Sequence, residues 1–99
     1  MATYIHLMEL GRENLETMEH SPDRRAAARE LVESYGGEIV SIYYTLGRYD
    51  VVSVVEYPDQ GAAARAAIRF RGAGNTRVET LPAFTEGEWD EAVVAELAE

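Results

Sequence analysis

Two segments with the pattern of β-strands, separated by a short turn, place the strongest constraint on how this chain folds. Apolar and polar side chains alternate in residues 38–46, and residues 51–57 are dense in valine. The residues between them, Gly47-Arg48-Tyr49-Asp50, are too few for a crossover, which predicts an antiparallel hairpin. A hairpin alone is marginally stable in water, so the rest of the chain has to supply further strands or a helix.

The rest of the chain shows the same two periodicities. Two more segments rich in β-branched and aromatic residues, Thr3–Glu9 and Asn75–Phe84, are predicted as strands, and Pro82 in the second is typical of an edge strand. Helical spacing predicts a short helical turn within residues 12–19 and three main helices. The main helices are expected over residues 21–35, 59–72 and 85–98.

Capping signals mark where two of these helices begin. Ser21 is predicted as an N-cap with Pro22 at the first helical position. Thr85 and Glu88 have the spacing of a capping box. The last helix also has residues placed for a hydrophobic staple and an apolar stripe: Phe84, Trp89, Val93 and Leu97.

The order strand, helix, strand, strand, helix, strand, helix predicts an α+β fold. With right-handed crossovers it gives a ferredoxin-like βαββαβ arrangement, in which the first strand lies between the third and the fourth of a four-stranded antiparallel sheet. The chain has 99 residues, which suits one domain, residues 1–99, ending in a C-terminal helix.

The first strand is apolar on both sides, which bears on assembly. Ile5 and Leu7 are expected to point toward the helices, while Tyr4, His6 and Met8 are expected on the opposite face. A solvated face should be polar, so the second face is predicted to pack against the same face of another copy, as in a dimeric α/β barrel. The alternative is that the C-terminal helix folds over the open face of its own chain.

Composition excludes several classes of function. The chain has 18 acidic residues, 9 basic residues and no cysteine, for a net charge of −9. This charge disfavours nucleic-acid binding, and the absence of thiols removes thiolate chemistry and zinc knuckles. No apolar run is long enough for a membrane span and the first residues lack a secretory signal, so a cytoplasmic location is expected. No cofactor is predicted, and no metal, because the two histidines, His6 and His20, lack ligand spacing.

Several short motifs resemble the GYD domain family, in the same order along nearly the whole chain. The turn contains Gly47, Tyr49 and Asp50, and similar segments are Met1–Ile5, Ser21-Pro22, Gly36-Gly37, Val55–Asp59 and Gly74–Thr85. The resemblance implies a ferredoxin-like fold of the dimeric α/β barrel type, and it implies no established activity. His6 departs from the family, because an aliphatic residue is expected there.

The polar positions of the predicted sheet suggest a candidate pocket. If the polar sides of the strands share one face, the side chains of His6, Ser53, Tyr43, Arg77 and Glu79 converge there. Glu79 would then orient the His6 imidazole as a general base, and Arg77 would bind an anion. The alternative is a polar row at a dimer interface. Tyr49 and Asp50 would line the mouth of the barrel or, alternatively, stabilise the turn.

Three classes of function follow from this pattern. The first is a homo-oligomeric small-molecule binding module with its ligand in the barrel, using His6, Tyr43, Tyr49, Asp50, Arg77 and Glu79. The second is a cofactor-independent enzyme, of monooxygenase or isomerase type, with His6 as the candidate catalytic residue; this rests on analogy of fold. The third is a structural or assembly protein. The expected partners are a second copy of the chain and a small-molecule ligand.

Overall fold

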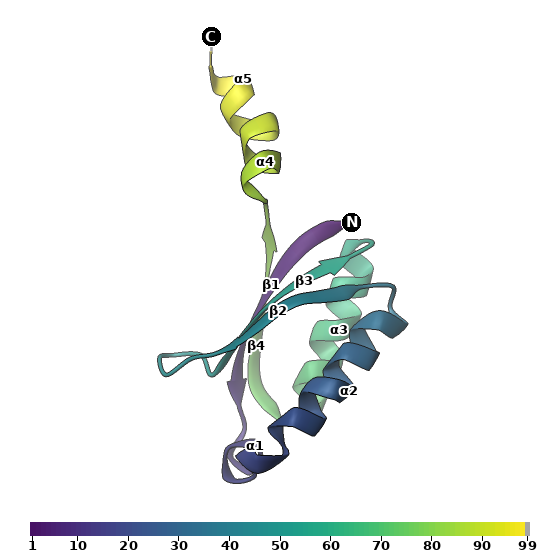
Figure 1. Ribbon diagram of the computed structural model, residues 1–99, viewed down its shortest axis with the longest axis vertical. Coiled ribbons are helices and arrows are strands. Elements are labelled where there is room, and N and C mark those ends of the chain that lie inside the picture. The colour runs from purple at the N-terminus through teal and green to yellow at the C-terminus, as the bar shows by residue number, and fades with distance from the viewer. Residues whose placement is uncertain (99) are drawn as a thin grey trace.

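The computed structural model describes residues 1–98, and four of its segments form one antiparallel sheet with the order β2-β3-β1-β4 (Figure 1). Helices α2 and α3 lie on one face of this sheet. The predicted α+β, ferredoxin-like order is therefore confirmed, and β4, which contains Pro82, is an edge strand. The elements are β1 (Ala2–Leu10), α1 (Arg12–Glu16), η1 (Met18–His20), α2 (Ser21–Ser34), β2 (Glu38–Tyr44), β3 (Val51–Tyr57), α3 (Gln60–Gly72), β4 (Asn75–Ala83), α4 (Glu86–Trp89), the π-helical turn η2 (Asp90–Val94) and α5 (Ala95–Leu97).

The helix starts agree only in part with their sequence signals. Thr85 and Glu88 form the predicted capping box, with Thr85 Oγ1 accepting from the Glu88 N–H at 3.1 Å. Asp59 caps α3 by accepting from the N–H of Ala62 at 2.8 Å. The prediction of Ser21 as an N-cap is wrong, because its backbone is already helical and its hydroxyl bonds to Tyr44 instead.

The centre of the core lies between β1, β3 and α3, where rings fill the space under small helical residues. The inner face of α3 is made of alanines, which let the helix backbone approach the sheet. His6 lies beneath this helix, with its ring centroid 5.4 Å from that of Phe70 and 5.7 Å from that of Tyr57. Tyr4, His6 and Met8 are therefore the inward side of β1. The expectation that Ile5 and Leu7 face the helices is wrong.

The opposite face of the sheet is aliphatic at its centre. Ile5 pairs with Val54 of β3 and Leu81 of β4, and Leu7 pairs with Val52, so these side chains share one face. Among residues 1–98, no helix lies over this face (Figure 1). We call it the open face. The prediction that the second face of the sheet is apolar holds, although the residues that form it are the opposite set on β1.

Residues 84–98, which we call the C-terminal arm, project away from the sheet (Figure 1). They give the molecule principal extents of 54 × 30 × 18 Å. The predicted staple is present, with the rings of Phe84 and Trp89 edge to face at 5.4 Å, but Trp89 is 47% exposed. The alternative that this helix folds over its own open face is therefore wrong. The sheet does not close into a barrel within the chain.

No helix within residues 1–98 combines the length and the apolar character that crossing a membrane requires.

Candidate functional site

The six residues predicted to bind a ligand lie in three separate places. His6 is on the helix-covered face of the sheet, and Tyr43 is on the open face, where it pairs with Val52. Tyr49, Arg77 and Glu79 form a cluster at one end of the open face. Asp50 holds the base of the β2–β3 hairpin. The grouping of His6 with Tyr43, Arg77 and Glu79 is therefore wrong, while ligand binding by any of these residues stays a prediction.

His6 is completely buried and both of its ring nitrogens are hydrogen-bonded. Nδ1 lies 2.8 Å from Thr80 Oγ1 and Nε2 lies 2.7 Å from Tyr57 Oη. A neutral imidazole has one donor and one acceptor nitrogen, and a hydroxyl can serve either role, so both tautomers satisfy the two bonds. The prediction that His6 has polar side-chain partners is confirmed, but their predicted identities, Glu79 and Tyr43, are wrong.

Burial sets the protonation of this group. It lowers the pKa of His6 to about 4 and raises the pKa of Tyr57. His6 is therefore neutral at pH 7. A general base has to come within hydrogen-bonding distance of its substrate, directly or through a water. His6 lies under α3 with both nitrogens occupied, so this geometry does not provide that access.

Tyr49, Glu79 and Arg77 form a compact polar cluster. The Tyr49 hydroxyl donates to Glu79 at 2.6 Å, and Arg77 donates to the other Glu79 oxygen at 2.5 Å. These hydrogen bonds, with that from Tyr49 first, lower the pKa of Glu79, and the same bond raises the pKa of Tyr49. Each member of the cluster is thus bound to another. Among the described residues, no three His, Asp or Glu side chains gather to hold a metal ion.

Asp50 connects the turn to β1. Its carboxylate accepts from the N–H of Leu10 at 2.8 Å, and its own N–H donates to the carbonyl of Met8 at 2.8 Å. Its carbonyl accepts from the N–H of Thr45 at 2.9 Å. We call these three bonds the hairpin clamp. They give Asp50 a structural role at the hairpin, which agrees with the alternative of turn stabilisation.

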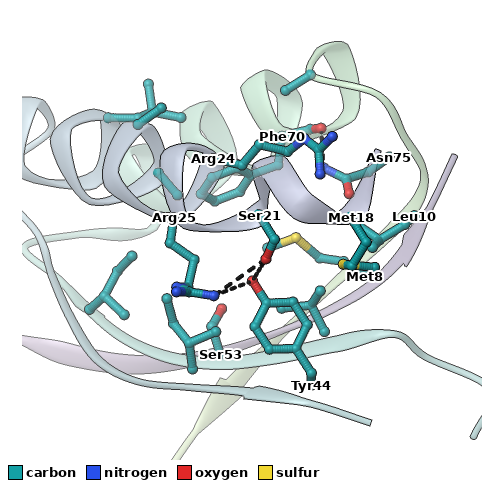
Figure 2. A pocket seen from close by; sticks show the side chains of 17 residues that line it. Met8, Leu10, Met18, Ser21, Arg24, Arg25, Tyr44, Ser53, Phe70 and Asn75 are labelled. Carbon is teal, nitrogen blue, oxygen red and sulfur yellow. Dashed lines mark hydrogen bonds between the residues drawn. The ribbon is translucent and has the colours of Figure 1, made fainter. Parts of the chain in front are cut away.

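A cavity between α2 and the sheet was not predicted from the sequence. It measures about 210 Å³, and its walls come from β1, η1, α2, β2, β3, α3 and the start of β4 (Figure 2). Its wall is mostly apolar, and Ser21, Arg25 and Tyr44 form a hydrogen-bonded group beside it. Ala27 and Ala28 of α2 line the cavity, and these small residues are the sequence signal that this helix leaves space, although small residues equally fit close packing.

The strand order, the helix-covered face and the hairpin clamp together define a ferredoxin-like α+β protein with an uncovered second sheet face. The family model described as GYD domain matches residues 4–93, and the chain belongs to the GYD domain family. Of the turn residues that carried the resemblance, Gly47, Tyr49 and Asp50, the last forms the hairpin clamp and the second binds Glu79.

One relative with a descriptive name comes from Thermus thermophilus. It is a "Glutamine synthetase and cystathionine beta-lyase binding protein", 36% identical over 85 residues, which cover 85% of this chain and 90% of the relative. No solved structure gives a significant match to the chain.

Proposed function

We propose that this chain is a protein-binding module that works as a homodimer, with the open faces of two sheets packed together. The observation that carries the proposal is the aliphatic centre of the open face, where Ile5 and Leu7 of β1 lie beside Val52 and Val54 of β3. An antiparallel sheet that faces water normally carries polar residues on that side. A contiguous apolar patch of this kind is typical of a protein interface.

The C-terminal arm favours a second copy as the occupant of the open face. Phe84, Trp89 and Leu97 of the arm are exposed, so the chain has two apolar surfaces that nothing in residues 1–98 covers. In a two-fold dimer each surface of one copy meets a surface of the other, and the assembly closes. One partner of known composition thus accounts for both surfaces.

The open face alone is too small for a stable dimer interface, so the arm has to contribute to it. Four strands at a spacing of about 4.8 Å and seven residues at about 3.3 Å each give a projected area of roughly 440 Å². A standard stable interface buries roughly 800 Å² per partner. The sheets would therefore supply about half of such an interface, and the arms would supply the rest.

This assembly would be the dimeric α/β barrel predicted from the sequence. A small ligand between the two sheets would meet Tyr43, Arg77 and Glu79, whereas His6 would lie on the far side of β1. The geometry of His6 gives no support to an enzyme that uses it as a base. A binding role is supported instead by the name of the Thermus relative, which describes a protein that binds two enzymes.

The oligomeric state tests the dimer. Sedimentation velocity at micromolar concentration should give a dimer for the natural chain, and Val54→Glu should give a monomer, because it places a charge at the centre of the open face. Ile68→Glu is the matched control, since Ile68 is an exposed aliphatic residue on α3. The natural chain sedimenting as a monomer, or Val54→Glu remaining a dimer, would refute the assembly.

Binding of an enzyme is tested separately. The purified chain should bind glutamine synthetase from the same organism in a calorimetric titration, as the name of the relative suggests. Cystathionine β-lyase serves as the second partner, and an unrelated acidic enzyme of similar size is the control. If neither enzyme gives a heat of binding, the name of the relative no longer supports a binding role for this chain.

A further inference from the structure

We propose that the cavity between α2 and the sheet binds a small monocarboxylate with an apolar tail, whose carboxylate contacts Arg25, Ser21 and Tyr44. This site lies on the helix-covered face, so the proposal does not depend on the dimer. Its basis is the combination of an apolar cavity, a cationic group beside it, and the Ser53 hydroxyl, which lines the cavity and hydrogen-bonds to no side chain of residues 1–98.

The cavity has the size and lining of a site for a small ligand. At about 210 Å³ it is far larger than the roughly 10–15 Å³ that one water occupies and smaller than the roughly 300 Å³ of a drug-sized pocket. Met8, Ile42 and Val51 form part of the floor, and Ala28 and Leu31 form part of the roof. Water gains few hydrogen bonds against such a wall, so an apolar tail is the better occupant.

Three polar side chains meet beside this cavity, as Figure 2 shows. Ser21 Oγ lies 2.9 Å from Tyr44 Oη, and Arg25 Nη1 donates to both oxygens at 3.3 Å. The Arg25 guanidinium also lies 5.7 Å from the centroid of the Tyr44 ring. The three groups are thus held in one place by each other, as the polar groups that orient a ligand in an apolar pocket normally are.

Arg25 has capacity left for an anion. Both of its hydrogen bonds use Nη1, and no carboxylate of residues 1–98 forms an ion pair with it. The neighbouring Arg24 differs, because its guanidinium donates to the carbonyls of Asn14 and Thr17 and holds the loop before α2. A guanidinium with free N–H groups binds a carboxylate through charge-assisted hydrogen bonds. The guanidinium selects an anion over a cation locally, against the net charge of −9 that the whole chain carries.

Ser53 is the independent observation that points to a ligand. It is 4% exposed and lines the cavity, and among residues 1–98 its hydroxyl makes no side-chain hydrogen bond. No buried side-chain oxygen of residues 1–98 lacks a partner, so the Ser53 hydroxyl is one that is reached through the cavity, and a bound molecule can hydrogen-bond to it there. In Figure 2, Ser53 lies near Arg25 and Tyr44. A carboxylate that contacts Arg25 and Tyr44 would therefore lie close to the Ser53 hydroxyl as well.

The experiment compares three probes that separate head from tail. Octanoate has both parts, 1-octanol has the tail with an uncharged head, and acetate has the head alone. Calorimetry should show that octanoate binds about tenfold or more tightly than either other probe. In NMR spectra, shifts of the amide signals around Ala28 and Ile42 should locate the site. Equal affinity for octanoate and octanol would overturn the proposal in favour of an apolar cavity without an anion site, and no response to octanoate at millimolar concentration would overturn it entirely.

Variants on one helix give the matched control. Arg25→Gln should weaken octanoate about tenfold and leave octanol unchanged, while Arg29→Gln, at an exposed position of α2 that does not line the cavity, should leave both unchanged. Ala28→Phe should fill the cavity and abolish both; its thermal melting, compared with that of the natural chain, shows whether it folds. An unchanged octanoate affinity in Arg25→Gln would overturn the role of Arg25, and with it the carboxylate site.

Discussion

The two faces of the sheet are composed in opposite ways. The helix-covered face has a polar centre, in which His6, Tyr57 and Thr80 are joined by hydrogen bonds. The open face has an aliphatic centre around Ile5 and Val54. The choice of buried side chains on each face therefore depends on the shape of the element that covers it. A helix of alanines needs large rings beneath it, and their polar atoms are tolerated because each has a partner.

The largest expected effect is on the helix-covered face. Phe70→Ala should lower the free energy of unfolding by about 3–5 kcal/mol, because the ring is buried against His6 and its loss enlarges an existing cavity. Urea titration measures the change. Ile68→Ala, on the exposed side of the same helix, should change stability by less than about 0.5 kcal/mol. Similar losses in both variants would show that α3 does not pack on the sheet through the side that carries Phe70.

The second effect is a pH dependence confined to the same face. The pKa of His6 is 6.5 in the unfolded chain and about 4 in the folded one, so the unfolded state binds the extra proton. The free energy of unfolding is therefore unaffected by protonation of His6 above pH 6.5, and it falls by about 3 kcal/mol as the pH is lowered toward 4. Urea titrations across this range should show the loss in the natural chain and in His20→Gln. His6→Leu should lack this part of the slope.

The third effect tests whether the polar centre is held by its hydrogen bonds. His6→Leu at pH 7 should cost about 1–3 kcal/mol, because it leaves the hydroxyls of Tyr57 and Thr80 without their partner. Adding Tyr57→Phe and Thr80→Val should restore much of the loss, since an all-apolar centre has no unpaired group. Chemical denaturation of the single and triple variants measures both. A single variant as stable as the natural chain would show that the bonds contribute little.

Element order, sheet order and the Thr85–Glu88 capping box were predictable because each depends on local patterns. The two faces of β1 were not, because Tyr4, His6 and Met8 are hard to rank against Ile5 and Leu7 by apolar character alone. The deciding information lies across the sheet, where Ser53 is the small partner of His6 on β3. In β2 the alternation from Ser41 to Tyr44 holds, and the register shift between Ile39 and Ser41 affects only Val40. Tyr43 was therefore grouped wrongly with His6 because His6 points to the other face of the sheet.

The candidate site shows the same limit. Asp50 was predictable as a turn residue from Gly47-Arg48-Tyr49-Asp50, because turn chemistry is local. The cavity under α2 was not, because it depends on how far the helix stands from the sheet. Ser21 illustrates this: its residue type is typical of N-caps, yet its hydroxyl bonds to Tyr44, far along the chain on β2. Only the three-dimensional arrangement brings Arg25 to the same point.

The smallest expected effect concerns the open face, and it tests whether the arm covers that face in solution. Trp89 is half exposed and its aromatic contact is with Phe84 of the same arm, so Trp89→Ala in the dilute monomer should cost less than about 1 kcal/mol. A loss of about 3–5 kcal/mol would mean that the ring is buried, as expected for an arm folded onto its own sheet. Trp89 is the only tryptophan, so its fluorescence reports on this directly. Emission typical of a hydrated indole at low concentration, shifting to the blue as the concentration rises, would place the arm on a second copy. Emission that is blue in a sample that sediments as a monomer would place the arm on its own open face and leave that surface unavailable to a partner.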